Sequence, residues 1–177
     1  LLFKINSLNS WADYTGEYIS FFENDIKIFN EKFLRLTNNL NSKNKYFFGG
    51  NGASAAICSH ISNDFSKTLK LKSYTFHDPA LITCFANDYG FENWISEAIK
   101  VNCSRKDVLI LLSSSGKSKN IVNAALTAKE LGMMVITLTG PTALKKLLKL
   151  SDLYIEIKSF NYNTIECCHM IALCSVI

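Results

Sequence analysis

Six consecutive residues, 113–118, read Ser-Ser-Ser-Gly-Lys-Ser and bring four hydroxyl groups together beside a glycine. Each hydroxyl donates one hydrogen bond, and a helix that starts directly after the segment adds unpaired N–H groups and a dipole that favours an anion. The segment lacks the GxxxxGK[ST] order of a nucleoside-triphosphate site, so we expect a phosphomonoester and no nucleotide. The alternative is a serine-rich turn whose last hydroxyl only caps the helix. The predicted phosphate ligands are Ser113, Ser114, Ser115 and Ser118.

A second segment, residues 49–54, reads Gly-Gly-Asn-Gly-Ala-Ser and also follows a short apolar run. Glycines allow the backbone to approach a ligand closely, and the next helix presents its N-terminal amides to an anion. A dinucleotide fingerprint that starts at Gly50 is incomplete, because Ala55 stands where its last glycine would be. The alternative is a tight strand-to-helix turn without a ligand.

A third polar segment contains Asn87 and Asp88, whose side chains are suited to holding sugar hydroxyls. Adjacent Asn and Asp are also ordinary turn and capping residues, and this second interpretation is favoured when the pair is taken alone. Upstream, we interpret His77 and Asp78, followed by Pro79, as a loop and the start of a helix.

From residue 45 onward, short apolar runs alternate with segments of helical length, which is typical of βαβ units and a parallel sheet. Most of the intervening segments are long enough for the crossover helices that parallel strands need. Ligands of such sheets bind beyond the carboxyl ends of the strands, where the glycine and serine segments fall. We predict an α/β three-layer sandwich with a five-stranded parallel sheet, its strands at residues 46–48, 73–76, 108–112, 133–138 and 153–157.

An N-terminal helical arm, residues 1–44, precedes this α/β core, residues 45–177, and together they form a single predicted domain. Apolar residues recur at intervals of three or four between residues 11 and 40, with a break near residues 24–25 that predicts two helices. We expect the arm to serve as core or as an oligomer interface.

The composition excludes several classes of protein. The 177 residues include 19 basic and 15 acidic side chains, and all the basic residues except Arg35 and Arg105 are lysines. Planar recognition of phosphate or guanine relies on arginine, so we expect no nucleic-acid partner and a phosphate held by hydroxyls and backbone amides. The six cysteines form no CxxC pair, which argues against a zinc ribbon or a disulfide framework. Without a long apolar run or a secretory signal pattern, we expect a cytoplasmic protein that does not enter a membrane.

Four segments, in this order and spacing, resemble the sugar isomerase (SIS) domain and, within it, the phosphoheptose isomerases, which convert sedoheptulose 7-phosphate to a heptose 7-phosphate. They are GNGAS at 50–54, ANDYGF at 86–91, SSSGKS at 113–118 and VITLTG at 135–140. The resemblance implies a helix-covered parallel sheet, a serine loop that grips the substrate phosphate, and a homo-oligomer, tetramer or dimer, with sites between subunits. It also implies that the sugar is lined by Asn51, Gly52, Ser54, Asn87 and Asp88.

The catalytic positions of the family match this chain less closely. Aldose–ketose conversion through an enediol needs groups that move protons, and some family members also hold zinc. His60 matches a family metal-ligand position, and Asp64 stands where the family has its catalytic Glu. On the last helix, Glu166 falls at a Gln position and Cys174 where the catalytic His is expected, while His169 lies five residues earlier.

Two interpretations of these residues follow. Glu166 and His169 are three residues apart and project together from a helix, so that Asp64, Glu166 and His169 form the predicted catalytic set. Alternatively, His60, Asp64 and Glu166, with either His169 or Cys174, surround zinc or another divalent metal, since all are acceptable ligand types.

Our main hypothesis is therefore a phosphoheptose-type sugar-phosphate isomerase that serves lipopolysaccharide or capsule synthesis. The missing C-terminal His motivates the alternative, a non-catalytic SIS protein that binds a phosphosugar or a protein partner. Isomerisation of a different sugar phosphate is the third possibility.

Overall fold

The computed structural model describes residues 11–38 and 43–177, and its centre is a five-stranded, all-parallel sheet with strand order β2-β1-β3-β4-β5. The α/β class and all five predicted strands are confirmed, each within one residue at either end. The strands are β1 (Lys45–Gly49), β2 (Lys72–Thr75), β3 (Val108–Ser113), β4 (Met134–Thr139) and β5 (Leu153–Glu156).

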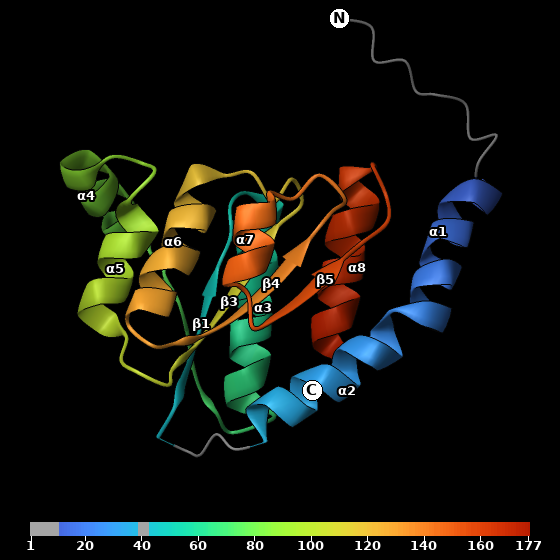
Figure 1. Cartoon of the computed structure of the whole chain (residues 1–177), viewed down its shortest axis with the longest axis horizontal. Helices are drawn as coiled ribbons and strands as arrows, with labels where there is room; N and C mark the ends of the chain where they lie inside the picture. Colours follow the sequence, from blue (N-terminus) through green and yellow to red (C-terminus); the bar gives the residue numbers. More distant parts are fainter. Residues whose placement is uncertain (1–10, 39–42) are drawn as a thin grey trace, which may run out of the picture.

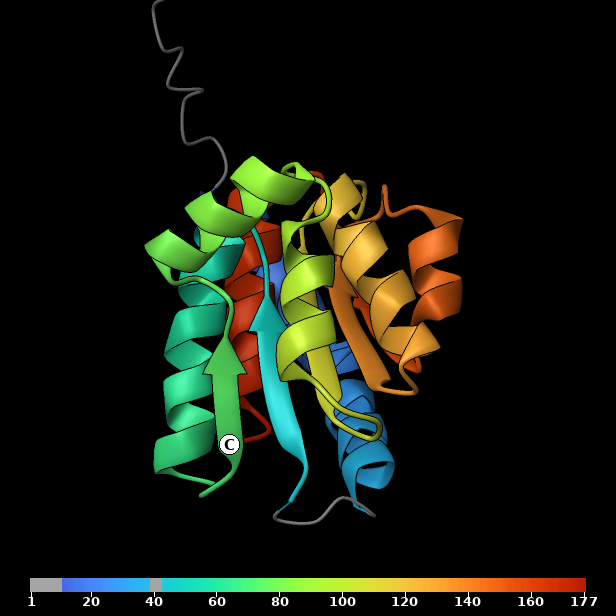
Figure 2. The same cartoon turned by 90° about the vertical axis from the view of Figure 1, so that its left-hand side faces the viewer.

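Helices cover both faces of the sheet, which gives three layers (Figures 1 and 2). Figure 2 shows α5 in front of the sheet and α8 behind it. One face packs against α1 (Trp11–Asn24), α2 (Ile26–Thr37), α3 (Ala53–Lys67) and α8 (Tyr162–Cys174). The other packs against α4 (Pro79–Tyr89), α5 (Trp94–Asn102), α6 (Lys119–Glu130) and α7 (Lys145–Leu150).

The central strand β3 is buried along its whole length because both of its faces are covered. Its alternate side chains enter opposite cores: Ile110 and Leu112 join the cluster beneath α3 and α8, whereas Leu109 and Leu111 join the cluster beneath α5 and α6. This double burial explains why the strand reads as an unbroken apolar run rather than an alternating one.

The helical arm lies beside α8 and the edge strand β5 (Figure 1). Phe21, Phe29 and Phe33 are buried in the core, and a turn at Asp25 separates the two helices, as the sequence predicts. Residues 1–10 and 39–42 of the predicted arm lie outside the described residues.

The strand order reverses between β1 and β3. The helix that follows β1 covers one face of the sheet, and the helix that follows β3 covers the other. Gly49 and Leu111 are paired in the register of the two strands, so the glycine segment and the serine segment emerge side by side. Parallel α/β proteins bind their ligands at such a point, outside the carboxyl ends of the strands.

Candidate active site

A cavity of about 130 Å³ opens where the strand order reverses. It receives side chains from the loop after β1, from the serine segment after β3, and from the first turns of α8, three parts of the chain that are distant in sequence. Its lining residues are Asn51, Ser54, Leu112, Ser113, Ser114, Ser115, Ser118, Tyr162 and Glu166. The four predicted phosphate ligands therefore lie together with one carboxylate in a single cavity.

The serine loop, residues 113–118, is held in a sharp turn around Gly116. The Gly116 N–H donates to the carbonyl oxygen of Ser113 at 2.9 Å and lies 3.2 Å from its Oγ. Gly116 has φ +60°, and a Cβ at this position would overlap the side chain of Ala143. Three hydrogen bonds of 3.0–3.2 Å from residues 140–144 to the carbonyl oxygens of residues 114–116 support the loop from behind. Hydrogen bonds and the packing of Gly116 against Ala143 thus hold the loop in its shape.

Among the described residues, two of the serine hydroxyls of this loop lack a hydrogen-bond partner. The Ser114 Oγ is buried and makes no hydrogen bond to any described residue. Ser118 occupies the N-cap position of α6, but its side chain makes no capping hydrogen bond, so a purely capping role does not describe its geometry. A buried, unsatisfied hydroxyl is costly, and an oxyanion that accepts a hydrogen bond from it relieves this cost.

Both arginines of the chain lie away from the cavity. Arg35 belongs to α2 and lines a separate depression beside β5, and the Arg105 side chain packs against Gly132, which precedes β4 at the amino end of the sheet. Lys117 is exposed on the serine loop. The cavity is lined by serine hydroxyls beside the N-terminus of α6, and neither arginine lines it.

The glycine loop, residues 49–52, is tied to the helix that follows the serine loop. The side-chain amides of Asn51 and Asn120 exchange two hydrogen bonds, of 3.0 and 2.8 Å, and Asn120 is buried. Gly52 has φ +56° and is the N-cap residue before α3, but it is exposed and is not among the residues that line the cavity. Sequence reasoning missed Asn120, whose only signal is a polar residue in the first turn after the serine loop.

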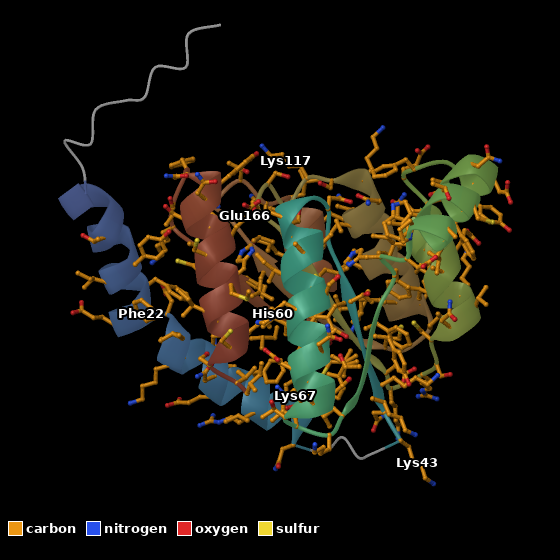
Figure 3. All side chains as sticks on the ribbon, turned by 180° about the vertical axis from the view of Figure 1, so that it is seen from behind. Phe22, Lys43, His60, Lys67, Lys117 and Glu166 are labelled. Atoms are coloured by element: carbon orange, nitrogen blue, oxygen red, sulfur yellow. The ribbon has the colours of Figure 1, made fainter. Side chains whose placement is uncertain are left out.

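The start of α8 contributes Glu166 and Tyr162 to the cavity. The side chain of Asn161 accepts a hydrogen bond from the Asn163 N–H at 3.0 Å, which fixes where the helix begins. Figure 3 shows Glu166 near the same end of the molecule as Lys117 of the serine loop. Sequence reasoning also missed Tyr162, because no motif distinguishes it from other exposed aromatics.

His60 and Asp64 form a pair on α3 outside this cavity. The His60 Nε2 and the Asp64 Oδ2 are 3.2 Å apart. In Figure 3, Glu166 lies near the upper end of the molecule and His60 lies lower. Cys174 on α8 is the alternative metal ligand of the sequence analysis. Burial, and after it the charge of Asp64, raises the pKa of its thiol. Within residues 11–38 and 43–177, no group of three His, Cys, Asp or Glu side chains is arranged to hold a metal. The predicted metal ligands His60, Asp64 and Glu166 therefore do not form a three-ligand group among the described residues.

His169 lies inside the core rather than in the cavity. Its side chain is fully buried, neither ring nitrogen completes a hydrogen bond to a described residue, and burial lowers its pKa to about 4 despite the nearby backbone of Thr139. The predicted grouping of Glu166 with His169 is not formed, because the three-residue spacing leaves one side chain at the cavity and the other against the sheet.

Asn87 and Asp88 lie on α4, away from the cavity of their own chain. Both are exposed, and the Asn87 Nδ2 donates to the Asp88 Oδ1 at 2.9 Å. In one chain they are therefore local partners of each other and do not line the cavity.

The fold and the position of the serine loop define an SIS-type α/β domain. The sequence pattern of the SIS domain family matches residues 20–140. The phosphoheptose isomerase of Haemophilus ducreyi is 32% identical over 160 residues, which cover 88% of this chain and 81% of the relative. That of Aneurinibacillus thermoaerophilus is 34% identical over 134 residues, which cover 72% and 67%. The solved structure of a phosphoheptose isomerase from Francisella tularensis shares the fold, with a TM-score of 0.83, 23% identity, and 93% and 91% of the two chains covered.

The chain belongs to the SIS domain family, and within this family it is similar in sequence to phosphoheptose isomerases. Among the residues described, no helix has the length and apolar character needed to cross a membrane.

Proposed function

We propose that this protein is a sugar-phosphate isomerase of the phosphoheptose type, which interconverts sedoheptulose 7-phosphate and an aldoheptose 7-phosphate. The observation that carries the proposal is a cavity lined by four serines at a helix N-terminus, with a carboxylate in the same cavity. The family membership and the relatives named above support this substrate class.

Phosphate binding follows from the serine loop. The Oγ atoms of Ser114 and Ser118 donate to the phosphate oxygens, and the N-terminus of α6 supplies a favourable dipole. Hydrogen bonds to charged groups are the stronger ones, so several donors compensate for the absence of an arginine. The phosphate thereby anchors one end of the sugar, and the remaining cavity wall faces its carbon chain.

Glu166 is the carboxylate placed to move protons. In the ketose, it removes a proton from C1 while the C2 carbonyl oxygen gains a proton, which gives the enediol. The O1 hydroxyl then loses its proton as C2 receives one, which gives the aldose with no net change in atoms or electrons. Tyr162 lines the same cavity and provides a hydroxyl for exchange at the oxygen atoms.

A non-catalytic phosphosugar-binding protein is the second candidate, and one observation favours it. His169 is sealed in the core, so it supplies no second acid or base to the cavity. Incubation with sedoheptulose 7-phosphate, with and without zinc, separates the two: formation of an aldose supports the isomerase, whereas binding without turnover supports the second candidate. Turnover of another ketose phosphate alone would identify a different isomerase.

A divalent metal, a homo-oligomeric assembly and a cytoplasmic location are further proposals. The His60–Asp64 pair offers two metal donors, and metal analysis of protein purified without chelator, compared with a His60→Ala variant, tests whether zinc binds.

The proposed cytoplasmic location rests on the cysteines. All six are free, which suits a reducing compartment. A role in lipopolysaccharide or capsule synthesis is tested by comparing the surface polysaccharide of a strain that lacks the protein with that of the parent strain.

A further inference from the structure

His77 lies two residues beyond the end of β2, next to the glycine loop. The parallel register pairs Phe48 with Thr75, so continuing the two chains by two residues brings Gly50 opposite His77. The Gly50 N–H points at the imidazole, with 3.3 Å from its nitrogen to the His77 Nε2. The loop-and-helix-start interpretation accounts for the next two residues, since Asp78 caps α4 and Pro79 is its first residue, but it leaves this contact unexplained.

The imidazole is fixed from two other sides. Its Nδ1 lies 3.5 Å from the Oγ of Ser59 on α3, and its ring meets the Trp94 ring edge-on, with 6.5 Å between the centroids. An Nε2 that accepts from a backbone N–H carries no proton, so Nδ1 holds the proton and faces the Ser59 hydroxyl. Burial lowers the pKa of His77, which keeps the ring neutral and able to accept.

The contact matters for the site because Gly50 has little freedom of its own. A Cβ at Gly50 would stand 2.8 Å from the backbone carbon of Ser54, so the loop backbone lies directly against the first turn of α3. The next residue, Asn51, lines the cavity and is held from the opposite side by Asn120. The glycine loop is thus fixed between a histidine at one end and a buried asparagine at the other.

We propose that His77 is a positioning residue, which holds the glycine loop through the Gly50 N–H so that Asn51 meets the sugar phosphate in its bound geometry. The proposal rests on the sugar-phosphate function only for its ligand; the hydrogen bond itself is independent of that function. His77 does not line the cavity, so it acts through the loop and does not touch the substrate.

Two substitutions separate this role from simple packing. In His77→Gln, the side-chain carbonyl oxygen reaches about as far as Nε2 and still accepts from Gly50. In His77→Leu, the ring is replaced by an apolar group that cannot accept. We expect His77→Leu to raise the dissociation constant and the KM for sedoheptulose 7-phosphate about fivefold, with kcat within twofold, and His77→Gln to restore both constants. Thr83→Val, which removes a hydrogen bond within α4, is the control and should change neither.

Two further measurements need no substrate. Nitrogen chemical shifts of the His77 ring should show a protonated Nδ1 and an unprotonated Nε2, and the Gly50 amide should exchange with solvent faster in His77→Leu than in wild type or His77→Gln. A protonated Nε2, or equal exchange in all three proteins, overturns the proposal. If wild type neither binds nor converts sedoheptulose 7-phosphate while the ring and amide results hold, the proposed function fails and the positioning role stands.

Discussion

The proposed isomerisation assigns the chemical step to Glu166, because this is the carboxylate that lines the cavity among the described residues. Replacing Glu166 by Gln keeps the size of the side chain but removes the base. We expect turnover of sedoheptulose 7-phosphate to fall by at least about 100-fold, with binding affinity changed by no more than a few-fold. Initial rates and calorimetric binding on the same preparation measure the two effects.

Asp64→Asn is the matched comparison, since the family resemblance implies that Asp64 is the base. The position of Asp64 beside His60, outside the cavity, predicts a smaller loss of turnover than in Glu166→Gln. An active Glu166→Gln variant together with an inactive Asp64→Asn variant would show that the base is on α3 and that our assignment is mistaken.

Buried His169 predicts a pH dependence of stability. Its pKa is lowered from 6.5 to about 4 in the folded protein, so the unfolded chain binds a proton more readily. Its contribution is fully present above pH 6.5 and is lost as the pH falls from 6.5 towards 4, by roughly 3 kcal/mol in total. Urea unfolding of wild type and His169→Leu across this range measures the contribution. Parallel curves for the two proteins would contradict it.

At the residue level, the sequence predicts ligand types better than it predicts which way side chains face. The four serines share the cavity because they lie within six residues at the end of one strand. Glu166 and His169 differ by about 60° around the helix axis, which is enough to separate a cavity wall from a core. No spacing rule decides this; the packing of α8 against the sheet does.

The proposed phosphate binding depends on the serine loop, whose shape is fixed at Gly116. A side chain at Gly116 is unfavourable for two reasons: the backbone has a φ of +60°, and the added Cβ would overlap Ala143. We expect Gly116→Ala to cost about 1–3 kcal/mol of unfolding free energy and to weaken sugar-phosphate binding. Thermal unfolding and calorimetry provide the two values.

Gly16→Ala is the control for Gly116→Ala, because Gly16 lies in α1 with open space around it. A methyl group there should leave binding unchanged and stabilise the helix by about 0.5–1 kcal/mol. Equal behaviour of the two alanine variants would show that the turn at Gly116 is not a constraint.

At the level of elements, the strands are predictable because burial on both faces imposes an apolar run. The contacts between elements are not predictable in the same way. Asn51 and Asn120 are 69 residues apart and meet only because the strand order places the loops after β1 and β3 side by side. Likewise, Asn87 and Asp88 follow β2 in sequence, but α4 carries them away from the cavity of their own chain.

Across the molecule as a whole, large apolar side chains remain exposed on the helical arm. They lie on α1 and α2 and are about half exposed; Figure 3 marks one of them, Phe22. These side chains are Ile19, Phe22, Ile28 and Leu34, with 55%, 46%, 52% and 59% of their surface accessible. Burial of such side chains between subunits is favourable at roughly 25 cal/mol per Å².

We therefore expect a homo-oligomer whose interface includes these exposed apolar side chains. Phe22→Lys combined with Ile28→Lys should shift the protein towards the monomer, as measured by sedimentation velocity, whereas Lys27→Ala should not. A wild-type protein that sediments as a monomer at micromolar concentration would contradict this expectation.

We propose that hydroxyls and main-chain donors, without arginine, hold a phosphate ester where β3 meets α6. The decisive experiment is calorimetric titration of sedoheptulose 7-phosphate into wild type, Ser114→Ala/Ser118→Ala and the control Ser66→Ala. We expect the double variant to bind at least tenfold more weakly, while the affinity of the control and the melting temperatures stay close to wild type. Equal affinity in all three proteins would show that the serine hydroxyls do not hold the phosphate.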